Sequence, residues 1–168
     1  SLKPGGGQGN HLTFLAQSDK ETCFIRIENG PESDHYMEVE ARVLDAVRAT
    51  GVPTPILYEV DSSRKEVPYS YQFLQHFEEP NLNQWYKTGR LNLRDVAREI
   101  GLSIAKWQSV RPAGFGPFDP EILKNQGVLE GYHSCYPNYF FLNLHRHLAF
   151  LVTNGILSEG ESGEILAT

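Results

Sequence analysis

The strongest constraint on the fold is the order in which two hydrophobic periods follow one another in the first half of the chain. Residues 11–16 and 22–28 alternate with a period of two, which predicts two strands joined as a hairpin by a short turn. Residues 33–50 follow a helical period, and residues 56–60 and 67–77 return to strand patterns. One helix between pairs of strands favours an antiparallel α+β lobe over a parallel nucleotide-binding sheet.

The predicted strand at residues 22–28 has two faces of different character. Cys23, Ile25 and Ile27 fall on one face, because side chains alternate along a strand. Phe24 and Arg26 fall on the other face. The period therefore places Arg26 in the predicted strand with its side chain on the face opposite the aliphatic residues.

The predicted helix at residues 33–50 carries a carboxylate in its apolar stripe. Ser33 or Asp34 is expected to cap its start, and Gly51 to end it. The residues of the apolar stripe are Met37, Glu40, Val43, Leu44 and Val47, and those of the solvent side are Asp34, Glu38, Arg42 and Asp45. A carboxylate in an apolar stripe requires a partner, so Glu40 is the residue that needs explaining.

Arg26 and Glu40 have two interpretations. A strand cation that meets a helix carboxylate can be held fixed against phosphate oxygens. Alternatively, the two form a plain structural salt bridge, or Arg26 is exposed and Glu40 lies at the edge of its stripe. The spacing in the sequence leaves both interpretations open.

The segment GGGQGN brings Gly5, Gly6, Gly7 and Gly9 together ahead of Asn10. No Gly-Lys follows, so the phosphate-loop pattern is absent, and a strand pattern follows where the dinucleotide pattern needs a helix. A glycine-rich turn between antiparallel strands can still fold over phosphates, since glycine lets backbone N–H groups approach an anion. A mobile end or an ordinary hairpin turn fits the same residues.

The second half of the chain is predicted to be mainly helical. Asn92 with Asp95 is expected to cap a helix, and its apolar stripe is Leu93, Val96, Ile100, Ile104 and Trp107. RPAGFGPFDP is expected to be a loop, and residues 138–153 to form a helix that ends at Asn154 and Gly155. Ser158 and Glu161 have the spacing of a capping box, which predicts another helix start.

Composition excludes several classes of partner. The 168 residues carry a net charge of −6, which argues against nucleic acid and anionic membranes. No run approaches the roughly 18 apolar residues of a membrane span. Cys23 and Cys135 are far apart, so we expect reduced thiols and a cytoplasmic protein. The only methionine is Met37, and the last predicted helix stops with the chain, so we expect a piece of a longer protein.

With these features in order, the chain resembles the aminoglycoside phosphotransferase and choline kinase group of protein-kinase-like enzymes. The resemblance covers nearly the whole chain and rests on an ordered series of segments. They are GGGQGN with HLTFLA, CFIRIENG, VEARVLDAV, GVPTPILYE, YQFLQHFEEPNL, LRDVAREIGLSIAKWQSV, GFGPFDP and YFFLNLHRHLAFLVTNGILS.

The resemblance implies a fold and a set of ATP-contacting residues. Residues 1–79 would be a kinase-like N-terminal nucleotide-binding lobe, and residues 80–168 the hinge exit and first helices of an incomplete C-terminal lobe. The implied nucleotide site comprises Gly5, Gly6, Gly7, Gly9 and Asn10 over the phosphates, Arg26 on the α and β oxygens, Glu40 fixing Arg26, and the Gln75, His76 and Phe77 backbone on adenine.

The resemblance also implies a reaction. The γ-phosphoryl group of ATP would move to a hydroxyl or amine of an aminoglycoside-, choline- or sugar-like molecule, with magnesium as cofactor. The family's H-G-D loop with its Asn, and the later Asp that holds magnesium, do not occur here. No catalytic residue or metal ligand is therefore expected in this segment, which would be inactive alone.

Three hypotheses stay open at this point. The first is the ATP-binding part of a small-molecule kinase, and the second is a catalytically silent kinase-like module that binds nucleotide or a partner protein. The third is an unrelated α+β domain, which predicts that Arg26 and Glu40 are not neighbours. Phe115, His133 and Tyr136 could line an acceptor pocket, although ordinary packing accounts for each. Neither the acceptor nor the oligomeric state follows from the sequence.

Overall fold

The computed structural model describes residues 1–6, 11–19, 21–30 and 35–167. The chain divides into two compact units, which are Ser1–Arg111 with Pro120–Leu129, and Pro112–Asp119 with Glu130–Thr168. Each unit is mixed α+β, which confirms the prediction for the first unit, whereas the second half of the chain was predicted to be mainly helical. The predicted lobe boundary between residues 79 and 80 stays a prediction.

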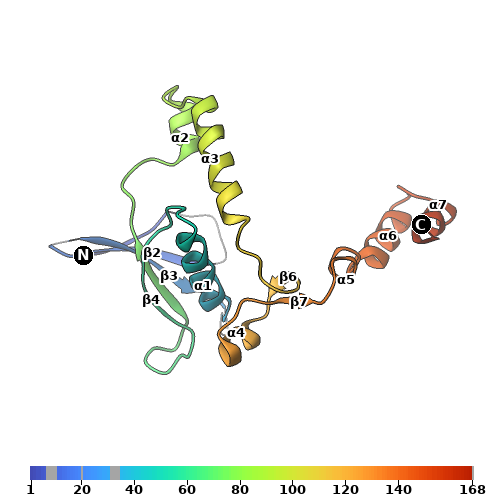
Figure 1. The fold of residues 1–168 in the computed structure, drawn as a ribbon, viewed down its shortest axis with the longest axis horizontal. Helices are drawn as coiled ribbons and strands as arrows, with labels where there is room; N and C mark the ends of the chain where they lie inside the picture. The colour runs from blue at the N-terminus through green and yellow to red at the C-terminus, as the bar shows by residue number, and fades with distance from the viewer. Residues whose placement is uncertain (7–10, 20, 31–34, 168) are drawn as a thin grey trace. The chain divides into compact units, whose positions relative to one another are not determined.

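The first unit is built on a five-stranded antiparallel sheet (Figure 1). Its strands are β1 (Leu2–Pro4), β2 (His11–Gln17), β3 (Thr22–Glu28), β4 (Leu57–Asp61) and β5 (Tyr71–Gln75), in the spatial order β1-β2-β3-β5-β4. The predicted hairpin of β2 and β3 is confirmed. β5 is shorter than the predicted strand at residues 67–77, and β1 is too short to show a period of its own.

The register of the sheet decides which side chains share a face. Arg26 on β3 lies opposite Thr13 on β2 and opposite Gln72 on β5. Paired residues point to the same side of a sheet, so these three side chains share one face. Ile25 pairs with Phe14 and Phe73 and belongs to the other face. The predicted separation of Arg26 from the aliphatic face of β3 is confirmed.

Helix α1 (Tyr36–Ala49) packs on the face that carries Arg26. Met37, Val39 and Ala41 are its buried residues, although the predicted stripe includes only Met37 of the three. The prediction was also wrong for Glu38, which accepts a hydrogen bond from Ser62 and is not on the solvent side. The reason is that β4 and helix α4 (Pro120–Gln126) also contact α1, so more than one side of the helix is covered.

Helix α1 starts without a side-chain cap and ends at a glycine. Its N-cap is His35, whose side chain makes no capping hydrogen bond, and the predicted caps Ser33 and Asp34 lie outside the described residues. At the other end Gly51 has φ +79°, a left-handed conformation that glycine adopts without strain. The predicted helix end is therefore confirmed.

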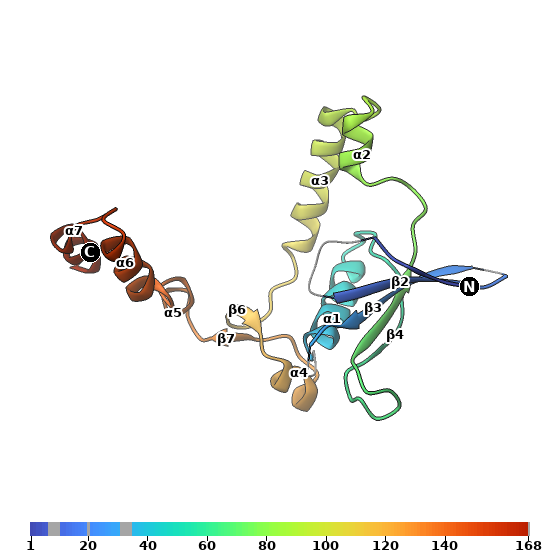
Figure 2. The same cartoon turned by 180° about the vertical axis from the view of Figure 1, so that it is seen from behind.

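Helices α2 (Leu82–Lys87) and α3 (Leu93–Trp107) lie side by side (Figures 1 and 2). Asn92 caps α3 as predicted, because its side chain accepts hydrogen bonds from the N–H groups of Arg94 and Asp95. The apolar period of α3 does not lead to burial, since none of its residues is buried. Four residues of its apolar stripe instead line a groove of about 530 Å³ together with Leu82 of α2, namely Val96, Ile100, Ile104 and Trp107.

The second unit contains a small two-stranded sheet and three helices. They are β6 (Phe115–Phe118), β7 (Gly131–His133), α5 (Tyr136–Phe140), α6 (Leu144–Thr153) and α7 (Glu159–Ala167). The predicted loop RPAGFGPFDP contains β6, whose partner β7 comes from a distant part of the sequence. The single helix predicted at residues 138–153 is wrong, because turns at residues 141–143 separate α5 from α6. The capping box of Ser158 and Glu161 at α7 is confirmed.

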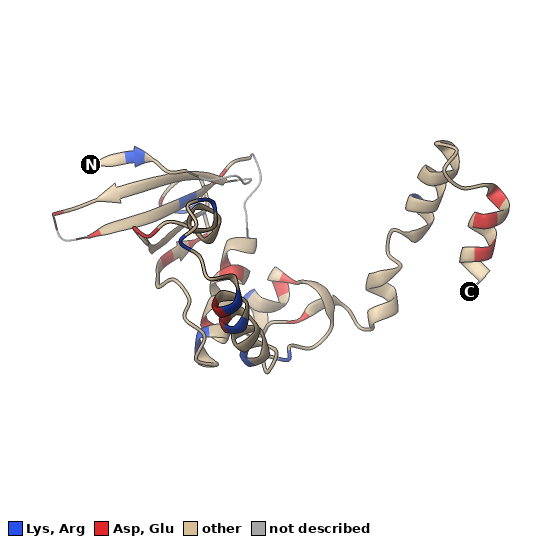
Figure 3. Cartoon of the chain, turned by 90° about the horizontal axis from the view of Figure 1, so that it is seen from above, with Lys and Arg blue, Asp and Glu red and all other residues tan. Residues whose placement is uncertain are grey.

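Charges are distributed differently on the helices (Figure 3). Acidic and basic residues are interspersed along α1 and α3, whereas α7 carries Glu159, Glu161 and Glu164 with no basic residue. In the part of the chain that the structure describes, no helix combines the length and the apolar content needed to cross a membrane.

Candidate functional site

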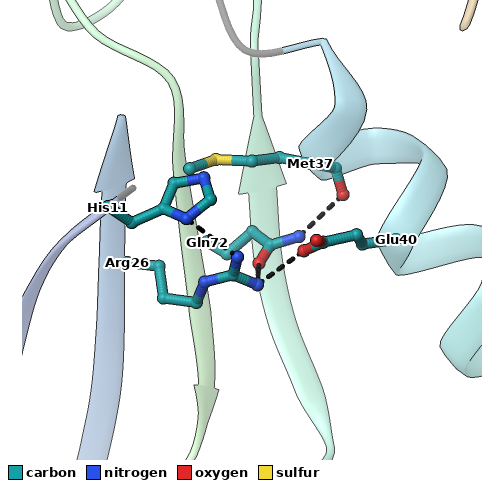
Figure 4. A network of polar contacts seen from close by, with 5 residues as sticks. All are labelled: His11, Arg26, Met37, Glu40 and Gln72. Atoms are coloured by element: carbon teal, nitrogen blue, oxygen red, sulfur yellow. Dashed lines mark hydrogen bonds and ion pairs between the residues drawn. The ribbon is translucent and has the colours of Figure 1, made fainter. Parts of the chain in front are cut away.

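Arg26 on β3 is the centre of a polar network that joins this strand to three other elements of the first unit (Figure 4). Its Nη1 donates to Glu40 Oε2 of α1 at 2.5 Å and to Gln72 Oε1 of β5 at 3.0 Å. Its Nη2 lies 3.0 Å from Nδ1 of His11 on β2. The guanidinium is therefore held by both neighbouring strands and by the helix.

Gln72 is the buried link of this network. Its side chain has no exposed surface, and its Nε2 donates to the backbone oxygen of Met37 at 2.7 Å. Its Oε1 accepts from Arg26, so each end of the amide faces the only kind of partner that it can use. Gln72 thus ties β5 to both the Arg26 guanidinium and the first turn of α1.

The contact between Arg26 and Glu40 bears on the interpretations left open by the sequence. The Arg26 and Glu40 side chains are 22% and 38% exposed, so the interpretation with an exposed Arg26 is wrong. The unrelated α+β domain predicts that the two are not neighbours, and the 2.5 Å contact contradicts this. A plain structural salt bridge and a phosphate clamp both agree with the geometry. Glu40, and not Glu38, is the carboxylate that contacts Arg26.

The pattern of contacts leaves part of the guanidinium for a ligand. An arginine carries five N–H hydrogens in a rigid fork. Among the described residues, three of these have partners, namely two on Nη1 and one on Nη2. The other two, one hydrogen on Nη2 and the hydrogen on Nε, have no partner in the part of the chain that the structure describes. A partly exposed guanidinium with two such donors can take a phosphate or carboxylate oxygen.

The glycine-rich segment begins beside this network. Gly5 N–H donates to the Thr13 oxygen at 2.7 Å, and Thr13 is the residue opposite Arg26. A Cβ on Gly5 would lie 2.8 Å from Thr13 Oγ1, so only glycine fits this close approach. The N–H of Gly5 is therefore used by strand pairing. Gly6 is described and exposed, whereas Gly7, Gly9 and Asn10 lie outside the described residues.

The predicted adenine-contacting segment follows directly after β5. Gln75 N–H donates to the Ile56 oxygen at 2.8 Å, so this donor is engaged by the sheet. His76 and Phe77 belong to no strand or helix, and the Phe77 side chain is exposed. Nδ1 of His76 is buried without a hydrogen-bond partner among the described residues. The role of the three residues toward adenine stays a prediction.

Other polar and aromatic groups of the chain are arranged less favourably for chemistry. Ser62 contacts both His35 and Glu38, but it is buried. The carboxylate contacts the serine and not the histidine, so the order of a catalytic triad is missing.

In the second unit Phe115 stacks edge-on against Tyr136, with ring centroids 6.0 Å apart. His133 lies opposite Phe115 in the register of β6 and β7 and faces Tyr139. The three residues are therefore neighbours, and their role in an acceptor pocket stays a prediction.

Sequence reasoning missed two members of the Arg26 network, His11 and Gln72. Each is a polar side chain inside a strand pattern, in phase with the polar face of β3. That phase is the signal available in the sequence, but it becomes usable only when the register is known.

Neither the side chains of the described residues nor comparisons with known proteins identify a cofactor or a family. Among the described residues, no group of three or more His, Cys, Asp or Glu side chains could hold a metal ion. Both cysteines are free thiols. We found no family model, no curated protein and no solved structure that matches the chain. The family resemblance therefore stays a prediction from the sequence segments.

Proposed function

We propose that the first unit binds ATP and that it is the nucleotide-binding part of a small-molecule phosphotransferase. The observation that carries the proposal is the ion pair between Arg26 on the third strand and Glu40 on the following helix. In protein kinases, a cation on the third strand pairs with a Glu of the next helix and holds the phosphates of ATP. Arg26 can serve as that cation because guanidinium matches phosphate geometry.

Two further observations support the same role for Arg26. The glycine-rich segment starts next to Arg26 in the sheet, because Gly5 contacts Thr13 and Thr13 is the cross-strand partner of Arg26. With respect to the described residues, one Nη2 hydrogen and the Nε hydrogen of the guanidinium have no partner, and an anion could accept from them. The transfer step would be mostly positioning and charge stabilisation, and Arg26 would supply both for the phosphates.

The proposed reaction moves the γ-phosphoryl group of ATP, with magnesium, to a hydroxyl or amine of an aminoglycoside-, choline- or sugar-like acceptor. The general base and the magnesium ligands are expected in an H-x-D-x-x-x-x-N loop outside residues 1–168. A catalytically silent module that binds nucleotide or a partner would share the Arg26 site and lack that Asp. ATP binding without transfer by a longer protein that has residues beyond 168 would favour the module.

The test of nucleotide binding is calorimetric titration of the chain with ATP and magnesium. Arg26→Ala and Glu40→Gln should each weaken binding by about 1–3 kcal/mol, the range for a lost charge-assisted contact. Arg98→Ala and Glu99→Gln are matched controls, since this exposed pair on α3 undergoes the same charge changes. Absence of ATP binding, or Arg26→Ala binding as wild type, would contradict the proposal.

A further inference from the structure

His11 contacts the proposed phosphate-binding cation directly. Nδ1 of its imidazole lies 3.0 Å from Nη2 of Arg26. A guanidinium only donates hydrogen bonds, so His11 Nδ1 must accept this one. The imidazole must then be neutral, with its proton on Nε2. A protonated His11 cannot accept the bond, and it places a second cation against the guanidinium.

Charged groups of both signs lie around the contact between His11 and Arg26. Glu28 lies directly opposite His11 in the register of β2 and β3, and Arg64 of the β4–β5 loop forms an ion pair with Glu28. Glu40 of α1 forms an ion pair with Arg26, the residue that His11 contacts. The contact with Arg26 requires a neutral His11, because a guanidinium donates hydrogen bonds and cannot accept them.

We propose that His11 is a positioning residue for Arg26, and that ATP affinity falls when His11 takes up a proton. The proposal rests on the proposed phosphate-binding role of Arg26. Glu40 and Gln72 both hold Nη1, whereas His11 is the partner of Nη2 among the described residues. Loss of the His11 contact lets the Nη2 end of the guanidinium move away from the geometry that the phosphates require.

The first experiment measures ATP affinity by calorimetry, with saturating magnesium, at about pH 6 and about pH 8. The comparison is between wild type, His11→Asn and His11→Leu. Asparagine places an amide acceptor near the Nδ1 position and does not titrate, so His11→Asn should bind within about twofold of wild type at the higher pH. His11→Leu should bind about 3- to 10-fold more weakly at both pH values, as expected for one lost hydrogen bond.

Comparing the variants at two pH values separates the effect of protonating His11 from the effect of protonating ATP. ATP and magnesium titrate in the same way with every variant, so the difference between wild type and His11→Asn belongs to His11. Wild type should lose about 3- to 10-fold more affinity than His11→Asn on going to the lower pH. Equal losses, or tighter binding of wild type at the lower pH, would overturn the positioning role.

The second experiment needs no nucleotide. Nitrogen-15 NMR of the imidazole rings should show unprotonated Nδ1 and protonated Nε2 for the signal that disappears in His11→Asn. A proton on Nδ1 of this ring at about pH 8 would overturn the inferred geometry. In Arg26→Ala, the preference of His11 for this tautomer should weaken.

The outcomes separate this proposal from the proposed function. If Arg26→Ala weakens ATP binding while wild type and His11→Asn share one pH profile, the His11 role is wrong and the ATP site stands. If the chain does not bind ATP, the positioning role fails together with the proposed function. A difference in pH profile, together with the expected tautomer, supports both.

Discussion

The buried side chain of Gln72 shows how much of the first unit depends on single polar contacts. It joins two strands and a helix, through Arg26 on one side and the Met37 oxygen on the other. A buried amide is stabilising only when both of its ends have partners. Because Gln72 has no exposed surface, water cannot replace a partner that is lost.

We predict that Gln72→Leu lowers the free energy of unfolding by about 1–3 kcal/mol. The substitution removes one of the acceptors of Arg26 and the side-chain donor of the Met37 oxygen, without opening a large cavity. Urea unfolding measures the difference. Gln17→Leu, at the exposed last residue of β2, is the matched control and should change stability by less than about 0.5 kcal/mol. Equal stability of Gln72→Leu and wild type would show that the buried amide is not a stabilising link.

Tyr71 carries a second contact of this kind on β5. Its hydroxyl donates to Glu59 Oε1 at 2.6 Å, and this hydrogen bond, together with burial, raises the pKa of Tyr71 to about 12. The folded state holds the phenol proton more tightly than the unfolded chain does. The contact is therefore fully stabilising below the ordinary tyrosine pKa of 10.0, and its contribution is lost as the pH rises through about 12.

The expected outcome is a difference in alkaline unfolding. Between about pH 10 and 12, the free energy of unfolding of wild type should fall more steeply than that of Tyr71→Phe, which cannot make or lose the Glu59 contact. Chemical unfolding at a series of pH values measures both slopes. Tyr86→Phe, at an exposed tyrosine, controls for the loss of one phenol and should keep the wild-type slope.

At the scale of elements, side-chain caps fix where the helices α2 and α3 begin. Asn81 and Gln84 form a full capping box at α2, and Asn92 caps α3 while donating to Asp95 Oδ2 at 2.6 Å. The Asn81 box is visible in the sequence as N-x-x-Q, although α2 was not predicted as a separate helix. Since no residue of α3 is buried, local contacts have a large share in its stability.

We predict that Asn92→Ala lowers the stability of α3 by about 1 kcal/mol, because two N–H groups of its first turn lose their acceptor. Asn92→Ser keeps a capping oxygen and should stay close to wild type. Hydrogen exchange of the amides of α3 measures the effect within the element. Unchanged exchange in Asn92→Ala would mean that the cap does not limit the opening of α3.

At the scale of the whole molecule, prediction succeeded where local patterns suffice. The α+β class, the β2–β3 hairpin, the face of Arg26, the cap of α3 and the capping box of α7 follow from period and spacing. The predictions were wrong where contacts with a segment remote in the sequence determine whether a residue is buried or belongs to a strand. β6 is a strand because β7 pairs with it, and Val39 and Ala41 are buried because β4 and α4 cover α1.

The candidate site divides in the same way. The sequence by itself determined that Arg26 lies on the polar face of its strand and that Glu40, in an apolar stripe, needs a partner, because helix and strand periods are local properties. Only the tertiary structure decided that the partner is Arg26 and that His11 and Gln72 complete the network. Neighbours across strands depend on register, and register is set jointly by turns and by packing, over separations that no local pattern spans.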